Sequence, residues 1–158
     1  SQFTINQEIA LAVELLDFGA LSQLFAMMRV KDKEHIALKY GVDDWRVFQS
    51  WLVSLNYLRN LSAHHSRLWN KNITDQPKLP TQGKIAFCDA FDGKADLTAK
   101  PFLLLCIVGH LLKIVCPATL WHQRIKEHMN SFPTIQSSRK LSVDDMGTVD
   151  NWQAMFQK

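Results

Sequence analysis

The sequence is poor in the residues that mark disulfide-rich and metal-binding proteins. Only three of its 158 residues are cysteines, namely Cys88, Cys106 and Cys116, and no two of them form a CxxC pair. An odd number of scattered cysteines disfavours a disulfide framework and fits a reducing cytosol. His122 and His128 are six residues apart, which places them on different faces of a helix. We therefore expect no disulfide, no metal site and a cytoplasmic protein.

No hydrophobic run is long enough to cross a membrane. The most apolar stretch, PFLLLCIVGHLLKIVC at residues 101–116, is shorter than the roughly 20 residues that a bilayer span requires. His110 and Lys113 interrupt it, so we expect a buried helix in which His110 is a hydrogen-bonded core histidine. The chain begins SQFT and shows no basic and apolar leader, so no signal peptide and no membrane partner are expected.

Alternating polar and apolar residues, which are typical of strands, are also lacking, and helical periodicity dominates. The expected helices cover residues 6–28 (divided at Gly19), 31–40 (closed by Gly41), Asp43 or Asp44 to about Ala63, 84–91, 101–116 (ended by Pro117) and 118–130. Residues 74–83 contain two prolines and a glycine and are expected to form a loop. The predicted fold class is all-α, a bundle of about five to seven helices.

The chain is long enough to bury one hydrophobic core. We assign residues 1–132 to one helical domain and residues 133–158 to a polar C-terminal extension that packs on this domain or trails from it. Only residues 149–156 of the extension suggest a further helical turn or two. The net charge of +3 and the pI of about 8.8 do not by themselves indicate nucleic-acid binding.

Acidic residues are missing from one region. Between Trp45 and Thr74 there is no Asp or Glu. The same region contains Arg46, Arg59, His64, His65, Arg67 and Lys71. Such a region attracts anions even when the whole chain is nearly neutral, although chance clustering on an ordinary surface would give the same pattern.

The long predicted helix carries an apolar stripe that ends in an arginine. The stripe members are three or four residues apart and share one face: Trp45, Phe48, Leu52 and Leu55, followed by Arg59 and Ser62. Arg59 is thus predicted in an interior or interface position, where a guanidinium is costly unless an anion or strong acceptor meets it. Alternatively, Arg59 ends the stripe by reaching water or by pairing with an acid elsewhere.

His64 follows Arg59 by five residues, which turn an ideal helix by about 140° and advance it by about 7.5 Å. The two side chains converge only if the helix ends near Ala63 or if a second copy brings its own pair across an interface, which is a reason to expect a dimer. A histidine can move a proton at a ribose 2′-hydroxyl, an arginine binds phosphate, and Asn60 can orient either group. Because RNA supplies its own nucleophile, this chemistry requires no metal or cofactor.

The string RNLSAHHSRLWN at residues 59–70 closely resembles the hallmark segment of the Abi-like abortive-infection proteins of the AbiD/AbiF type, which belong to the HEPN superfamily. The resemblance extends upstream through residues 14–25, 36–42 and 50–60 and weakens at PKLP and at MGTVDNW (146–152). Because relatives usually carry a further N-terminal region, the chain is expected to correspond to the C-terminal portion of such a protein.

This resemblance implies a HEPN-like helical bundle that dimerises with its two motifs facing each other. It also implies a metal-independent endoribonuclease acting in phage defence or in a toxin–antitoxin system. Carried over to this sequence, Arg59, Asn60 and His64 would form the catalytic centre. The residues His65, Arg67, Asn70 and Lys71 are assigned as auxiliary RNA contacts or as local structure.

The expected partners are an RNA substrate, a second copy of the chain, and an antitoxin or regulatory RNA that restrains activity. The alternative is a non-catalytic HEPN helical module that uses the same segment to bind RNA or protein, or to dimerise. Trp69 is expected to be a packing residue, although it is close enough to the motif to stack on a base.

Overall fold

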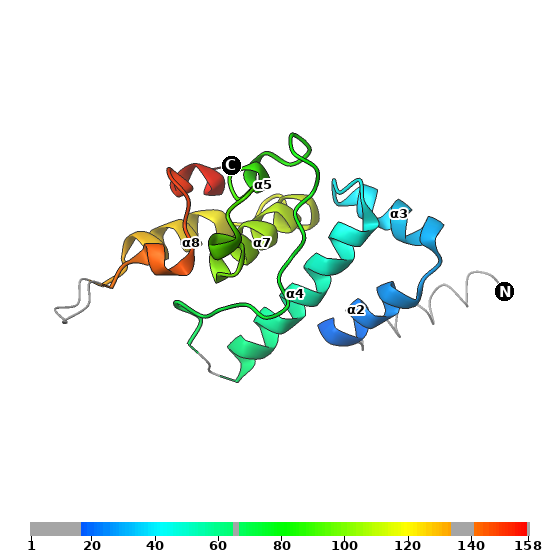
Figure 1. Cartoon of the computed structure of the whole chain (residues 1–158), viewed down its shortest axis with the longest axis horizontal. Coiled ribbons are helices and arrows are strands. Elements are labelled where there is room, and N and C mark those ends of the chain that lie inside the picture. The colour runs from blue at the N-terminus through cyan, green and yellow to red at the C-terminus, as the bar shows by residue number, and fades with distance from the viewer. Residues whose placement is uncertain (1–16, 65–66, 134–140, 158) are drawn as a thin grey trace.

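The structure, a computed structural model, describes residues 17–64, 67–133 and 141–157 (Figure 1). In these ranges no strand forms, which confirms the all-α prediction. The helices are α2 (Phe18–Met27), α3 (Val30–Lys39), α4 (Trp45–Ala63), α5 (Ala86–Asp89), α6 (Ala95–Thr98), α7 (Pro101–Val115), α8 (Trp121–Asn130), and the 3-10 helices η1 (Val143–Met146) and η2 (Trp152–Phe156). None of these helices is long and apolar enough to span a bilayer.

The longest helix, α4, runs diagonally through the molecule, with α2 and α3 on one side and α7 on the other (Figure 1). Asp44 caps its first turn, because its Oδ1 accepts the backbone N–H of Arg46 at 2.8 Å. The helix ends at Ala63. Both ends confirm the sequence prediction.

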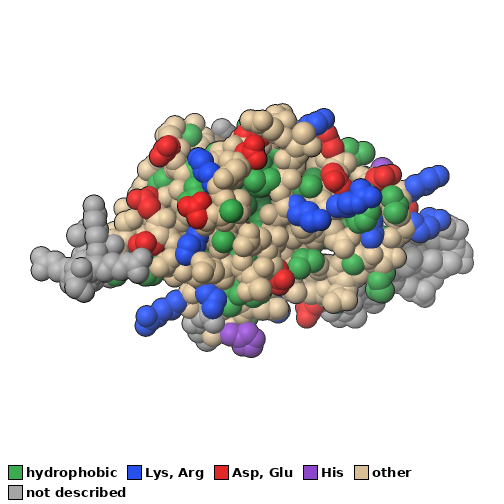
Figure 2. Space-filling view, in the orientation of Figure 1, with side chains coloured by type: hydrophobic (Ala, Val, Ile, Leu, Met, Phe, Trp, Pro, Cys, Tyr) green, Lys and Arg blue, Asp and Glu red, His purple; other side chains and the backbone are tan. Residues whose placement is uncertain are grey.

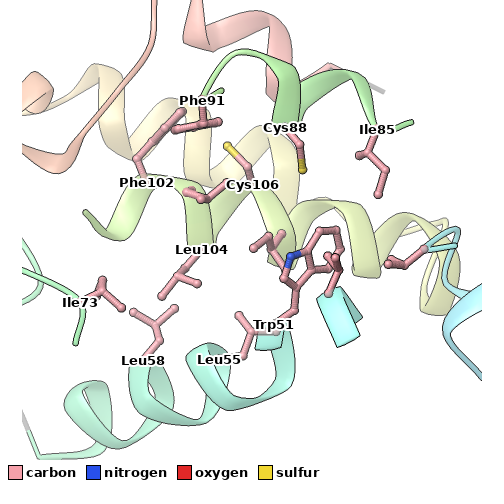
Figure 3. Packing of buried hydrophobic residues seen from close by; sticks show 14 of the residues in the cluster. Trp51, Leu55, Leu58, Ile73, Ile85, Cys88, Phe91, Phe102, Leu104 and Cys106 are labelled. Carbon is pink, nitrogen blue, oxygen red and sulfur yellow. The ribbon is translucent and has the colours of Figure 1, made fainter. Parts of the chain in front are cut away.

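The hydrophobic core lies between α4 and α7. Trp51 of α4 is completely buried, as are Leu103, Leu104 and Ile107 of α7. Figure 3 shows Leu58 pointing from α4 toward Leu104 and Ile73. Removing this apolar surface from water is the main stabilising contribution, at about 25 cal/mol per Å² buried.

Three side chains of α4 form hydrogen bonds with the backbone of the loop at residues 74–83. The indole Nε1 of Trp51 donates to the carbonyl of Lys78 at 2.9 Å, and the N–H of Lys78 donates to Ser50 Oγ at 2.9 Å. Ser54, which is fully buried, donates its hydroxyl to the carbonyl of Asp75. The loop was predicted from its prolines, and these bonds fix where it lies.

The C-terminal segment packs on the core over residues 143–156. Val149, Trp152 and Phe156 are buried. The ring of Phe156 packs edge-to-face against two other rings. Its centroid is 5.8 Å from that of Phe102 of α7 and 5.9 Å from that of Trp121 of α8. Of the two arrangements that the sequence left open for this segment, packing and trailing, these residues show packing.

Several predicted boundaries were wrong. Gly19 does not divide a helix, because α2 already begins at Phe18, where the Asp17 side chain caps it at 2.8 Å. The remainder of the predicted 6–28 helix, up to residue 16, lies outside the described residues. The helix predicted at 84–91 is a single turn, α5, and the one predicted at 118–130 begins only at Trp121.

Gly147 is the glycine with the closest neighbours, and replacing it with alanine is expected to destabilise the fold. Its φ is +85°, and an added Cβ would overlap with the Cβ of Lys100. Gly83 has a similar φ of +82° but open space around it, so G83A carries only the backbone strain. We expect G147A to lose about 1–3 kcal/mol more than G83A in urea unfolding, because overpacking adds to the strain. Equal losses would contradict the close approach to Lys100.

Candidate functional site

Arg59 lies in the last part of α4 and is exposed to solvent. Its Nη1 donates to the side-chain Oδ1 of Asn60 at 3.0 Å. In the described part of the chain it forms no ion pair; the ion pairs found there join Arg29 to Asp32, Arg46 to Asp44, and Lys84 to Asp43. The guanidinium is therefore oriented by a neutral neighbour and is accessible to an anion from solution.

Arg59 does not lie in the interior of the chain, which was one of the positions that its spacing left open. The most deeply buried side of α4 carries Val47, Trp51, Ser54 and Leu58, in addition to Phe48 and Leu55. Because α7 packs against that side, the stripe predicted from spacing lies at its edge. Its members Phe48, Leu52 and Leu55 line an apolar groove of about 660 Å³ between α2, α3, α4 and α7, and Arg59 follows one turn later in solvent. The alternative, an arginine that reaches water, is what the structure shows within one chain.

His64 is the C-terminal cap of α4 and is also exposed. Its backbone N–H donates to the carbonyl of Asn60 at 3.1 Å. Asn60 thus forms hydrogen bonds with the other two residues of the predicted centre. Its side chain accepts from Arg59, and its backbone carbonyl accepts from His64. Because α4 is regular as far as Ala63, the side chains of Arg59 and His64 leave the helix about 140° apart.

The auxiliary residues lie in the segment that follows α4. His65 is outside the described residues. Arg67 and Lys71 are exposed and form no ion pair within the described ranges. Figure 2 shows a histidine and Lys or Arg side chains projecting at the lower edge of the molecule, where α4 ends in Figure 1. The end of α4 is therefore a cationic, solvent-facing surface.

Trp69 and Asn70 instead attach this segment to the rest of the fold. The indole of Trp69 donates to the carbonyl of Ser142 at 3.0 Å, and its ring lies 6.0 Å from that of Phe132. Asn70 has a φ of +55°, a conformation that asparagine tolerates, and its Oδ1 accepts from Lys100 Nζ at 2.6 Å. Trp69 is a packing residue, as predicted, and the contact of Asn70 with Lys100 is structural.

A family model described as Abi-like protein matches residues 6–70. Over these residues, which are less than half of the chain, it is similar to the Abi-like family. The matched region includes α2, α3, α4 and the segment up to Asn70, and so contains every residue of the predicted catalytic centre. No curated protein and no solved structure matches the chain.

Two histidines in the interior of the fold, His110 and His122, have structural partners. The Nε2 of His110 is 2.8 Å from the carbonyl of Tyr40, and the Nε2 of His122 is 2.9 Å from that of Gly109. Since a carbonyl only accepts, each Nε2 carries the proton. His110 is the hydrogen-bonded core histidine that the sequence predicted.

The buried cysteines are not nucleophiles at neutral pH. Burial raises the pKa of the Cys88 thiol to about 12, and burial also raises the pKa of Cys106. Both stay protonated, and the thiolate is the reactive form. Among the described residues no three His, Cys, Asp or Glu side chains gather as metal ligands. The exposed groups at the end of α4 are therefore the best candidates for chemistry.

Lys100 and Ser142 hold the site segment but were not found from the sequence. Lys100 is thirty residues from Asn70, and its place before Pro101 indicates only the start of a helix. Ser142 contributes a backbone carbonyl, which any residue type would supply. No pattern in the sequence identifies either contact.

Proposed function

We propose that this protein is a metal-independent endoribonuclease of a bacterial abortive-infection or toxin-type defence system, acting in the cytoplasm. Similarity to the Abi-like family over residues 6–70 suggests a part in abortive-infection defence. The observation that carries the chemical part of the proposal is the exposed set Arg59, Asn60 and His64 at the end of α4, with a guanidinium that no carboxylate of the described residues neutralises.

In the proposed reaction the imidazole of His64 takes the proton from a ribose 2′-hydroxyl. The 2′-oxygen then attacks the adjacent phosphorus and the bond to the 5′-oxygen breaks. The leaving 5′-oxygen receives a proton from a His64 imidazolium. Arg59 stabilises the negative charge that develops on the phosphate oxygens. The products are a 2′,3′-cyclic phosphate and a 5′-hydroxyl, so electrons and protons balance without a metal or cofactor.

We further propose that two copies build the site together in a HEPN-like dimer. A single chain presents Arg59 and His64 on different sides of α4, and a second copy would supply the missing group on each side. Arg67 and Lys71 are well placed to bind flanking phosphates because both are exposed. His65 belongs to the same proposal by its place in the motif. An antitoxin or regulatory RNA is proposed to restrain the activity.

Cleavage of RNA in the presence of EDTA tests this proposal. Wild type is expected to cut, and R59A to be slower by about a hundredfold or more, as for loss of one donor to the transition-state charge. R29A is the matched control, because Arg29 is also exposed but pairs with Asp32 at 3.0 Å. If wild-type dimers do not cut, or if R59A cuts as fast as R29A, the proposal is wrong.

One observation favours a second candidate, a helical module that binds RNA or protein, or dimerises, without chemistry. The side chains of Arg59 and His64 leave α4 in directions about 140° apart. This arrangement is compatible with two separate contacts to a bound anion, as well as with a composite site built by two copies. RNA binding that is retained in wild type with no cleavage, and that is insensitive to H64A, would support this second function.

A further inference from the structure

The segment that follows the proposed catalytic residues is held at its far end by contacts to the start of α7. The N–H of Ile73 donates to the carbonyl of Ala99 at 2.7 Å. Lys100 Nζ donates to Asn70 Oδ1 at 2.6 Å and lies 3.4 Å from the carbonyl oxygen of Asn70. We refer to the Asn70–Lys100 pair as the clasp. α4 fixes one end of the segment, and the clasp fixes the other.

Lys100 is itself held rigidly. It precedes Pro101, which restricts its backbone to an extended conformation, here φ −110° and ψ 161°. Gly147 approaches its Cβ so closely that no side chain fits there. The clasp is partly buried, and a hydrogen bond from an ammonium to an amide oxygen is stronger than one between neutral groups. Lys100 therefore has a restrained position, and its hydrogen bond determines the position of Asn70.

Arg67 and Lys71, the two exposed cations of the segment, lie on either side of the clasp in the sequence. We propose that Lys100 is a positioning residue of the site: through Asn70 it holds the segment that carries these cations at the end of α4. The inference rests on the proposed function. It extends the site beyond the Abi-like match, which ends at Asn70 and does not include Lys100.

A different role for Lys100, as one more cation for RNA, predicts different contacts. An ammonium that bound phosphate would project into solvent. The ammonium of Lys100 is instead directed at the side chain and carbonyl of Asn70. The two roles are separable because positioning requires Asn70, whereas phosphate binding does not.

The experiment compares K100M, N70G and the double variant K100M/N70G. Methionine keeps the length of the stem, and glycine tolerates the positive φ of Asn70. K94M is the matched control, because Lys94 is an exposed lysine whose side chain forms no hydrogen bond within the described residues. K100R keeps the donors and tests rescue.

If Lys100 acts through Asn70, K100M and N70G each lower kcat by about tenfold with KM nearly unchanged, as for a displaced site. The double variant is then no worse than either single one, and K100R recovers most of the loss. Losses that add in the double variant, or that raise KM and vanish at high salt, would overturn the inference and identify a phosphate contact.

Hydrogen exchange of the Lys71 and Ile73 amides gives a measurement that does not depend on activity. Both N–H groups are bonded, to the carbonyls of Leu68 and Ala99, and we expect exchange to be at least about tenfold faster in K100M than in K94M. If wild type did not cleave RNA, the nuclease proposal would fail. Independently of that result, faster amide exchange in K100M would support the positioning role of Lys100. Unchanged exchange would overturn that role.

Discussion

Replacing His64 with alanine is expected to lower the rate of RNA cleavage by about 10² to 10⁴-fold, the range that a general acid or base typically contributes. In the proposed reaction this imidazole moves the proton of the 2′-hydroxyl. The fold should be retained, because the contact of His64 with Asn60 is made by the backbone N–H, which alanine keeps. Unfolding by urea should therefore give the same midpoint for H64A and wild type.

H35A is the matched control for this experiment. His35 is an exposed histidine on α3, outside the acid-free region, and its removal should leave cleavage within about twofold of wild type. RNA binding by H64A, measured by fluorescence anisotropy, should persist, since the cations Arg59, Arg67 and Lys71 remain. Equal activity of H64A and H35A would mean that the imidazole of His64 takes no part in the reaction.

The largest expected effect on stability follows from replacing Trp51 with alanine. Trp51 is fully buried and joins four parts of the fold: its own helix α4, the loop at Lys78, α5 through Phe87 at 6.2 Å, and α7 through His110 at 5.8 Å. Removing a buried tryptophan typically costs about 3–5 kcal/mol. The carbonyl of Lys78 would also lose its donor. A loss of this size is a large part of the stability of most domains, so W51A should unfold at much lower urea.

Two further variants keep this prediction testable if W51A does not fold. W51F keeps a ring but lacks the indole N–H, and we expect it to lose about 1–3 kcal/mol, the cost of an unpaired buried acceptor plus the smaller ring. W45A removes a half-buried tryptophan from the same helix, whose ring is contacted by Lys33 and Arg46, and should lose less than W51A. If W45A lowered the free energy of unfolding as much as W51A or more, Trp51 would not be the centre of the core.

The parts of the fold that were predicted correctly are those with local signals. Asp44 at the start of α4, Pro101 at the start of α7 and Gly41 after α3 act through their own backbone or nearest neighbours. Their effects can be read from residue type alone. The catalytic candidates Arg59, Asn60 and His64 also came from a short local string at the end of α4, and their role stays a prediction.

The parts that were missed depend on contacts between distant segments. Spacing along α4 could not tell which side α7 covers, so it left open whether Arg59 lies in an interior or interface position or reaches water; in the structure Arg59 is exposed. The C-terminal segment was predicted to be a polar extension that packs or trails, and only the structure shows Trp152 and Phe156 packed against Phe102. The clasp between Asn70 and Lys100 joins residues thirty positions apart, and only the folded chain brings them together.

The central claim is that the end of α4 cuts RNA through the substrate's own 2′-hydroxyl. The most direct measurement uses two oligonucleotides that differ only at the scissile position, which carries ribose in one and 2′-deoxyribose in the other, incubated with wild type in EDTA. We predict that only the ribose substrate is cut and that its products end in a 2′,3′-cyclic phosphate and a 5′-hydroxyl. Cutting of the deoxy substrate at the same bond, or cutting of the ribose substrate that stops when EDTA is added, would contradict the account.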